Sequence, residues 1–319
     1  MSHASLTDSR SRIDANSDEL ADTSVLGQYI PLIYHYHMLQ DTDRVDAFRR
    51  AIELIVRPGM HVVELGGGTG ILSSFAALAG ASVTCVERNP ELVRCARRCL
   101  ADNALTNRVE VIQTDACRYL PDSPVDVVVC EMLHVGLLRE KQAQVLTAFK
   151  KNYLSVFGPK LPVFIPEASI LMAQPVQQCF DFSGYIAPVP MFQVPSPDQP
   201  RTREIATLYA YANIAYDDFI PSSLTMSAEI HAACDGRVNA IRLVTQNVLG
   251  IDMQQKQAIT WPNQCLVLPI ETPFDVSEHD SVKMSFGYRP GDDIETLSRS
   301  IKLIPPVQCS PRATGRPFD

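Results

Sequence analysis

The sequence predicts an α/β domain built on a parallel sheet, followed by an all-β domain. The first observation is a buried strand, a glycine-rich turn, a helix and a second strand that follow one another between His61 and Glu87. The second is a run at 125–131 rich in β-branched residues, typical of a strand buried on both faces of a parallel sheet. The third is a series of segments beyond residue 166 in which apolar and polar residues alternate, as in half-exposed antiparallel strands.

Length and composition indicate ordinary globular material. The 319 residues are 46% hydrophobic and 20% charged, which suffices for two modest domains. A formal net charge of −8 argues against a nucleic-acid partner, which would need a basic face, and suits a cationic substrate. The nine cysteines show neither CxxC pairing nor histidines at metal spacing, so we expect reduced thiols and no metal site.

The N-terminal residues and the absence of long apolar runs bear on location. Residues 1–24 are polar, carry both signs of charge and lack the apolar core of a secretion signal. A disordered or flexible arm is therefore predicted there. No apolar run reaches the length of a membrane span, and we expect a cytoplasmic protein with no membrane partner.

The first predicted element is a helix from Val25 to Val56. Apolar residues recur in it at intervals of three, four and seven, and Arg57-Pro58-Gly59 ends it. Two further elements follow the opening unit, a helix at 90–100 and a strand at 109–112.

The glycine-rich turn in HVVELGGGTG, at 61–70, predicts a site for an adenosine-containing cofactor. Glycines let a ligand approach the backbone closely, and the start of the next helix offers free N–H groups. Glu87 ends the following strand, where a carboxylate can accept two ribose hydroxyls. The alternative, a glycine loop that merely closes a strand-helix-strand unit, does not account for this acid.

Two carboxylates follow the strand at 125–131. Ligands of an open parallel sheet bind beyond the carboxyl ends of its strands, so Glu131 is predicted to point at the reaction site. Glu140 comes nine residues later and is predicted to begin a helix. The helix macrodipole would favour an acid there in any case, which is the alternative reason for its presence.

Two motifs carry a resemblance to a known family. ELGGGTG, at 64–70, resembles the first motif of class I S-adenosylmethionine methyltransferases. HYHMLQDTDR, at 35–44, resembles the H-x-x-M-L-x-D-x-x-R segment of protein arginine methyltransferases, which folds over the bound cofactor. The resemblance implies a divergent member of that family, with S-adenosyl-L-methionine as cofactor. It also implies a Rossmann-like methyltransferase domain at 25–165 and a β-barrel-like substrate domain at 166–319.

The resemblance implies roles for single residues. Arg44 would pair with the carboxylate of the cofactor's methionine part, which suits a guanidinium fork. Asp115 resembles the acid that binds the adenine amino group, and a polar turn residue is the alternative. The predicted cofactor-binding residues are His35, Met38, Arg44, Glu64, Gly66, Gly68, Gly70, Glu87 and Asp115.

Glu131 and Glu140 are the predicted catalytic residues, because the family carries two glutamates at this separation in a hairpin-like loop. Two carboxylates can hold the donors of a planar guanidinium and direct one nitrogen at the methyl carbon. Methyl transfer is an in-line displacement that is helped chiefly by positioning and desolvation. The loop departs from the family's S-E-W-M-G-Y, since this chain has CEMLHV at 130–135, and the pocket wall is therefore changed.

The second half is predicted to contain strands at 169–172, 206–212, 224–231, 240–247, 264–269 and 282–288. The proline-rich stretch 175–203 will not form a regular helix; it is either a shortened counterpart of the family's dimerisation arm or a long surface loop. AITWPNQ, at 258–264, resembles the family's threonine-histidine-tryptophan loop, with Thr260 at the histidine position and so a hydroxyl as partner of Asp41. The predicted substrate-pocket residues are Tyr29, Asp41, His134, Thr260 and Trp261.

These observations predict an S-adenosylmethionine-dependent N-methyltransferase that acts on a guanidino group of free arginine, of a small guanidine or of arginine in a peptide or protein. A homodimer is expected. The altered glutamate loop leaves open an N- or O-methyltransferase of another small metabolite. An inactive cofactor-binding scaffold is the alternative from a different class, and the presence of Arg44, Glu87, Glu131 and Glu140 argues against it.

Overall fold

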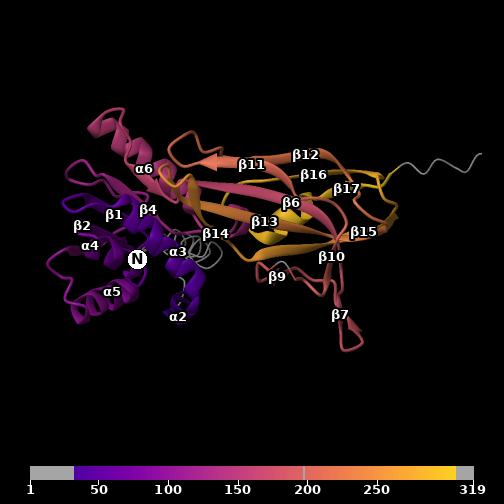
Figure 1. The fold of residues 1–319 in the computed structure, drawn as a ribbon, viewed down its shortest axis with the longest axis horizontal. Helices are drawn as coiled ribbons and strands as arrows, with labels where there is room; N and C mark the ends of the chain where they lie inside the picture. Colours follow the sequence, from indigo (N-terminus) through magenta and orange to yellow (C-terminus); the bar gives the residue numbers. More distant parts are fainter. Residues whose placement is uncertain (1–31, 197, 307–319) are drawn as a thin grey trace, which may run out of the picture.

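The computed structural model describes residues 32–196 and 198–306. The predicted arm at 1–24 and Tyr29 lie outside these residues. Figure 1 shows an α/β part, in indigo and magenta, beside an elongated β part, in orange and yellow. A parallel sheet followed along the chain by antiparallel sheets confirms the predicted fold class.

A five-stranded parallel sheet forms the α/β part, in the order β3-β2-β1-β4-β5. The strands are β1 (His61–Leu65), β2 (Ser82–Glu87), β3 (Val109–Gln113), β4 (Val127–Cys130) and β5 (Val163–Ile165). The helices α4 (Ile71–Leu78), α5 (Pro90–Asp102) and α6 (Gln142–Phe157) connect them. The strand order reverses between β1 and β4, which opens a crevice beyond their carboxyl ends.

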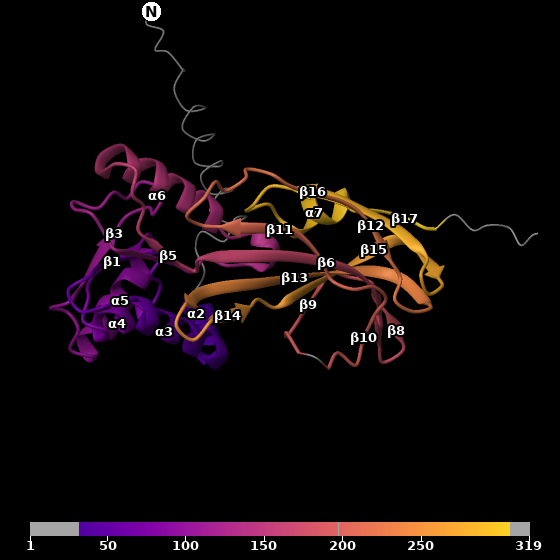
Figure 2. The same cartoon turned by 45° about the horizontal axis from the view of Figure 1, so that its top comes forward.

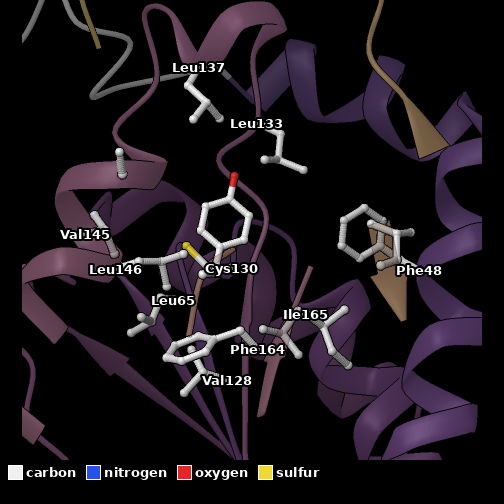
Figure 3. Packing of buried hydrophobic residues seen from close by; sticks show 14 of the residues in the cluster. Phe48, Leu65, Val128, Cys130, Leu133, Leu137, Val145, Leu146, Phe164 and Ile165 are labelled. Atoms are coloured by element: carbon white, nitrogen blue, oxygen red, sulfur yellow. The ribbon is translucent and has the colours of Figure 1, made fainter. Parts of the chain in front are cut away.

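The sheet is covered on both faces, with α6 on one side and α4 and α5 on the other (Figure 2). This explains the apolar, β-branched strands, because neither face meets water. In Figure 3, Val128, Phe164 and Ile165 lie between Leu146 of α6 and Phe48 of the N-terminal helices. Burial of these side chains fixes the strand ends that carry the polar residues.

The predicted helix at Val25–Val56 is wrong as one continuous element. In the described residues it is two helices, α2 (Leu32–Gln40) and α3 (Thr42–Ile55). Asp41 lies between them and caps α3, because its side chain accepts the backbone N–H of Arg44 at 3.1 Å. The apolar spacing runs on across the break, so the sequence pattern conceals it.

The described residues of the β part form two larger antiparallel sheets and a separate two-stranded hairpin. The seven-stranded sheet runs β10-β6-β13-β15-β9, with β11 beside β6 and β14 beside β13. Its strands are β6 (Ala168–Gln178), β9 (Met191–Gln193), β10 (Thr202–Glu204), β11 (Tyr209–Ala215), β13 (Gly236–Asp252), β14 (Gln257–Pro262) and β15 (Cys265–Val276). The smaller sheet comprises β12 (Leu224–His231), β16 (Ser281–Tyr288) and β17 (Lys302–Ile304), with the helix α7 (Ile294–Ser300) before β17. The sheets share one apolar core.

Two segments of the β part differ from the sequence-based expectation. The stretch at 258–264, expected as a loop, lies mostly in β14, where Trp261 is the register partner of Asn247 in β13. The stretch at 175–203 begins inside β6 and continues into a hairpin of β7 (Asp181–Phe182) and β8 (Tyr185–Ile186). This hairpin projects from the body in Figure 1. No helix of the described residues is long and apolar enough to cross a membrane.

Candidate active site

A cavity of about 200 Å³ lies beyond the carboxyl ends of the parallel strands. Its lining comes from α2 and α3, the glycine turn, the ends of β2, β3 and β4, and the start of α6. The predicted site residues that it brings together are His35, Met38, Arg44, Glu64, Gly66, Gly68, Glu87, Asp115, Glu131 and Glu140. Residues far apart in the sequence thus meet at the point where the strand order reverses.

Backbone hydrogen bonds hold the glycine turn against the end of β2. The N–H of Gly66 and that of Gly67 both donate to the carbonyl of Val86 at 2.9 Å. Gly68 has φ +55°, and a Cβ there would lie 2.9 Å from the ring carbon Cε1 of His35. Only glycine allows this backbone conformation together with so close an approach of α2. The turn is therefore the floor of the cavity, and α2 lies over it.

Gly70 does not line the cavity as predicted. It precedes α4, and a Cβ on it would contact Leu100 and Ala96 of α5. Its role in the structure is the close packing of α4 on α5.

Glu87 has the geometry of an acceptor for two hydroxyls. Its Oε2 accepts the N–H of Gly68 at 2.9 Å, and its Oε1 accepts the N–H of Asn89 at 2.7 Å. The side chain is buried at the cavity wall. Each carboxylate oxygen retains acceptor capacity for a further donor, which fits the ribose of an adenosine ligand.

Glu64 joins β1 to α4 as well as lining the cavity. Its Oε2 accepts the backbone N–H of Ser73 at 2.8 Å and also the Ser73 hydroxyl. Burial raises the pKa of Glu64 to about 7, although the hydrogen bonds from Ser73 oppose the rise. A carboxyl with a raised pKa binds its proton more tightly in the folded state than in the unfolded state.

Glu64→Gln is expected to reduce the pH dependence of stability. For the native protein the free energy of unfolding falls as pH rises between the ordinary pKa of 4.5 and about 7, because the folded state holds the extra proton. The slope from one such group is at most about 1.4 kcal/mol per pH unit. Urea unfolding from pH 4 to 9 measures it. If the free energy of unfolding had the same pH dependence in the native protein and in Glu64→Gln, the raised pKa of Glu64 would be contradicted.

Glu131 and Glu140 lie in the same cavity and influence each other. Burial raises the pKa of Glu131, and its ion pair with the Arg44 guanidinium opposes the rise. Burial and the nearby Glu131 raise the pKa of Glu140 to about 8. α6 begins at Gln142, so the prediction that Glu140 begins the helix is wrong.

Arg44 lies between Glu131 and an aromatic ring. Its guanidinium pairs with the carboxylate, and its Cζ is 5.5 Å from the ring centroid of Trp261. Trp261 is buried and packs against Phe48 of α3. The break at Asp41 starts α3 with Arg44 in its first turn, which directs this side chain toward the crevice.

Four predicted substrate-pocket residues lie in the described part of the chain but do not line the cavity: Asp41, His134, Thr260 and Trp261. Thr260 is exposed on β14, and the partner that the structure gives to the Asp41 carboxylate is the backbone of Arg44. His134 packs edge-on against Phe192, with ring centroids 5.6 Å apart. Burial lowers the pKa of His134 to about 4, so its ring is neutral at physiological pH.

Asp115 makes the contacts of a polar turn residue, which is the alternative given for it. Its Oδ1 accepts the N–H of Cys117 at 2.9 Å, as a turn residue does, and its Oδ2 lies 3.8 Å from the Nη1 of Arg88. It also lines the cavity.

The lining fits an adenosine-containing ligand. Nε2 of His35 is buried and has no hydrogen-bond partner in the part of the chain that the structure describes. Burial lowers the pKa of this ring, so a neutral imidazole nitrogen is available beside the glycine turn. Together with Glu87 it gives the cavity polar groups for a sugar or an amino-acid moiety.

Sequence reasoning missed several residues of the lining, among them Met132, Lys141 and Val145. Met132 packs on the glycine turn, since a Cβ at Gly66 would meet its side chain. Lys141 and Val145 also line the cavity. Their only signal in the sequence is position. Met132 directly follows Glu131, Lys141 directly follows Glu140, and Val145 lies one helical turn beyond Lys141.

Comparison with known proteins finds relatives of two kinds. A family model described as a methyltransferase domain matches residues 62–152. An uncharacterized protein of Methanothermobacter thermautotrophicus is 30% identical over 270 residues, which are 84% of this chain and 97% of that protein. The arginine N(omega)-methyltransferase of Streptomyces achromogenes subsp. streptozoticus is 33% identical over 135 residues, which are 40% of this chain and 37% of that protein.

Two solved structures share the fold. Protein arginine methyltransferase 10 of Arabidopsis thaliana has a TM-score of 0.66 at 19% identity, covering 79% of this chain and 87% of that chain. The PRMT1 enzyme-prozyme complex of Trypanosoma brucei with AdoHcy has a TM-score of 0.64 at 17% identity, covering 79% and 86%. At these identities the likeness is one of fold, and it confirms the predicted fold class.

Proposed function

We propose that this chain, which belongs to the class I S-adenosylmethionine-dependent methyltransferases as a divergent member of the arginine methyltransferase type, methylates a guanidino group. The observation that carries the proposal is the pair of carboxylates, Glu131 and Glu140, that line the cavity formed by the glycine turn. Neighbouring carboxylates in a site poor in water favour a bound cation. The Streptomyces relative, by its name an arginine methyltransferase, supports the same substrate class.

S-adenosylmethionine supplies an electrophilic methyl group on a sulfonium. The glycine turn, His35 and Met38 would hold this cofactor, with Glu87 as acceptor for its ribose hydroxyls. Arg44 would turn its guanidinium from Glu131 to the carboxylate of the cofactor. That exchange leaves the Glu131 carboxylate for the substrate.

Glu131 and Glu140 then orient the substrate. A guanidinium presents its donors in a plane, and two acceptors on that plane restrict its rotation. The low exposure of the Glu131 side chain, 7%, strengthens its bonds because little water competes for them. The bound guanidinium lowers the pKa of Glu140 and keeps it ionised, so this carboxylate of the cavity can receive the proton that the nitrogen loses.

Binding of a guanidine to the protein with its demethylated cofactor is expected to release about one proton at pH 7. Glu140 is mostly protonated at that pH because its pKa is about 8, and an adjacent cation lowers the pKa again. Calorimetry in buffers of different ionisation enthalpy measures the release. Glu140→Gln should release none, and a binding enthalpy independent of buffer in the native protein would contradict this role.

The proposed function is tested with heavy-methyl cofactor. The protein is incubated with free arginine, other small guanidines, arginine-rich peptides and a cell extract, and the products are identified by mass spectrometry. Label on a guanidino nitrogen supports the proposal, and the arm in which it occurs identifies the substrate. Label only on an amine, hydroxyl or carboxyl group, or tight cofactor binding with no transfer to any acceptor, would contradict it.

We also propose a homodimer formed through the β7–β8 hairpin. Tyr185 and Ile186 are 74% and 64% exposed beside Phe182 on this projecting element, and exposed apolar side chains that are grouped in this way suit an interface. Tyr185→Asp is expected to shift sedimentation from dimer to monomer. Phe219→Asp is the control, because Phe219 is 81% exposed on another part of the β part. A native monomer, or a dimer that survives Tyr185→Asp, would argue against this interface.

A further inference from the structure

The segment between the two glutamates has little regular structure of its own. After β4 ends at Cys130, it contains the short 3₁₀ helix η1 (Val135–Leu137) before α6 begins at Gln142. A carboxylate that orients a substrate needs a fixed direction. The backbone that carries Glu131 must therefore be held by other parts of the molecule.

Gln142 holds the backbone on both sides of Glu131. Its Oε1 accepts the N–H of Met132 at 3.0 Å, and its Nε2 donates to the carbonyl of Cys130 at 2.8 Å. The side-chain amide thus pairs with the chain as a neighbouring strand would. Gln142 is fully buried, and the two bonds require a side chain that both donates and accepts.

A second support reaches the same segment from the β part. Nδ2 of Asn263 donates to the carbonyl of Leu133 at 3.2 Å, and its Oδ1 accepts from Nδ2 of Asn247 at 2.8 Å. The Ser169 hydroxyl donates to Oδ1 of Asn247 at 2.6 Å and lies 2.8 Å from the hydroxyl of Tyr216. Because the Ser169 proton is directed at Asn247, Tyr216 is the donor in this last bond.

Tyr216 is the far end of the second support. Burial raises the pKa of its hydroxyl, and the side-chain hydrogen bond with Ser169 opposes the rise. The buried side chains of Tyr216, Ser169, Asn247 and Asn263 therefore form one chain of hydrogen bonds, here called the loop network, which reaches the segment at Leu133. Gln142 holds the same segment separately, on both sides of Glu131.

We propose that Gln142 and Asn263 are positioning residues, which set the direction of the Glu131 carboxylate through the backbone on either side of it. The inference rests on the proposed role of Glu131 in binding the guanidino group. Buried polar side chains destabilise a core when any partner is missing, whereas a fully bonded network gives a unique arrangement. The loop network therefore suits a role in orientation better than one in stability alone.

Gln142→Met tests the first support, because methionine matches the length and helix propensity of glutamine but lacks a strong donor. We expect kcat for the guanidine to fall 10- to 100-fold, with cofactor affinity within threefold of native. Gln144→Met is the matched control: Gln144 lies in the same first turn of α6, and its amide donates to the carbonyl of Pro290 instead. Asn263→Ala tests the second support and should lower kcat in the same direction.

Gln142→Glu supplies a readout that a merely structural role would not give. A protonated carboxyl can donate to Cys130 and accept from Met132, but a carboxylate cannot donate. The activity of this variant relative to the native protein should therefore recover as pH falls. It also serves where Gln142→Met fails to fold.

Amide hydrogen exchange of Met132 and Leu133 provides a measurement that needs no substrate. Exchange at Met132 should be at least tenfold faster in Gln142→Met than in Gln144→Met. Unchanged exchange, unchanged kcat, or a parallel loss of cofactor affinity and unfolding midpoint would overturn the inference. If the native protein methylates no guanidine, the proposed function fails, and the exchange result alone then decides whether Gln142 positions the loop.

Discussion

Glu131→Gln is expected to lower methyl transfer to a guanidine by about 10²- to 10³-fold, the loss seen when one preorganised charged or polar group is removed from an active site. Glutamine keeps the size of the side chain but replaces one acceptor oxygen with a donor that faces the guanidinium. The Glu131 side chain is only 7% exposed, so water cannot replace the lost acceptor. Single-turnover rates with saturating cofactor measure the effect.

Two further measurements make the Glu131 result specific. Cofactor affinity should change by less than about threefold, because the predicted contacts of the cofactor are with Arg44, Glu87 and the glycine turn. Glu110→Gln is the control for the chemical change, since Glu110 is exposed on β3 of the same sheet. If Glu131→Gln transfers the methyl group at a rate within tenfold of native, Glu131 has no role in the reaction. If Glu110→Gln loses as much activity, the loss in Glu131→Gln is an effect on stability.

The glycine turn and the position of Glu131 could be predicted because their signals are local. The run of valines at 127–129 marks a strand buried on both faces, and a carboxylate directly after it must lie at the carboxyl edge of the sheet. In a parallel sheet the residue that directly follows a strand lies at the carboxyl edge, so its position in the sequence gives its position in the structure. No contact between distant residues is needed for that step.

The partners of Arg44 and Asp41 could not be predicted in the same way. The apolar period crosses the break between α2 and α3, so only the side-chain cap of Asp41 reveals it. Trp261 was expected in a loop because its segment resembles the family's threonine-histidine-tryptophan loop, whereas it lies in β14, which pairs with β13. For Trp261 a tertiary contact decides between local structures that the sequence leaves nearly equal.

The loop network has no sequence signal. Ser169, Tyr216, Asn247 and Asn263 are polar residues scattered over the β part, and each alone reads as a half-exposed strand or turn residue. They meet only because β6 and β13 pair with Ser169 opposite Asn247. The register of two long strands, which no local pattern specifies, thus determines which polar groups can support the Glu131 segment.

Gly67→Ala is expected to have the largest effect on stability and to weaken cofactor binding. A Cβ on Gly67 would overlap Sγ of Cys85, which is fully buried in β2. Neither strand can yield, since Glu64 of β1 is the register partner of Cys85, so the turn must move into the cavity. Overpacking of this kind costs about 3 kcal/mol. Urea unfolding and calorimetry of the cofactor measure the two losses.

Cys85→Ala should partly rescue Gly67→Ala, because it removes the sulfur atom that the new methyl group meets. Alone it leaves a small cavity and costs about 1 kcal/mol. The double variant should then be more stable than the sum of the single changes by about 1–2 kcal/mol, as expected for residues in contact. Gly287→Ala is the control, because a Cβ there has ordinary contacts at 3.5 Å. If the free-energy changes of the two single substitutions simply add in the double variant, the turn accommodates a side chain by another movement. The glycine run would then be needed for the ligand alone.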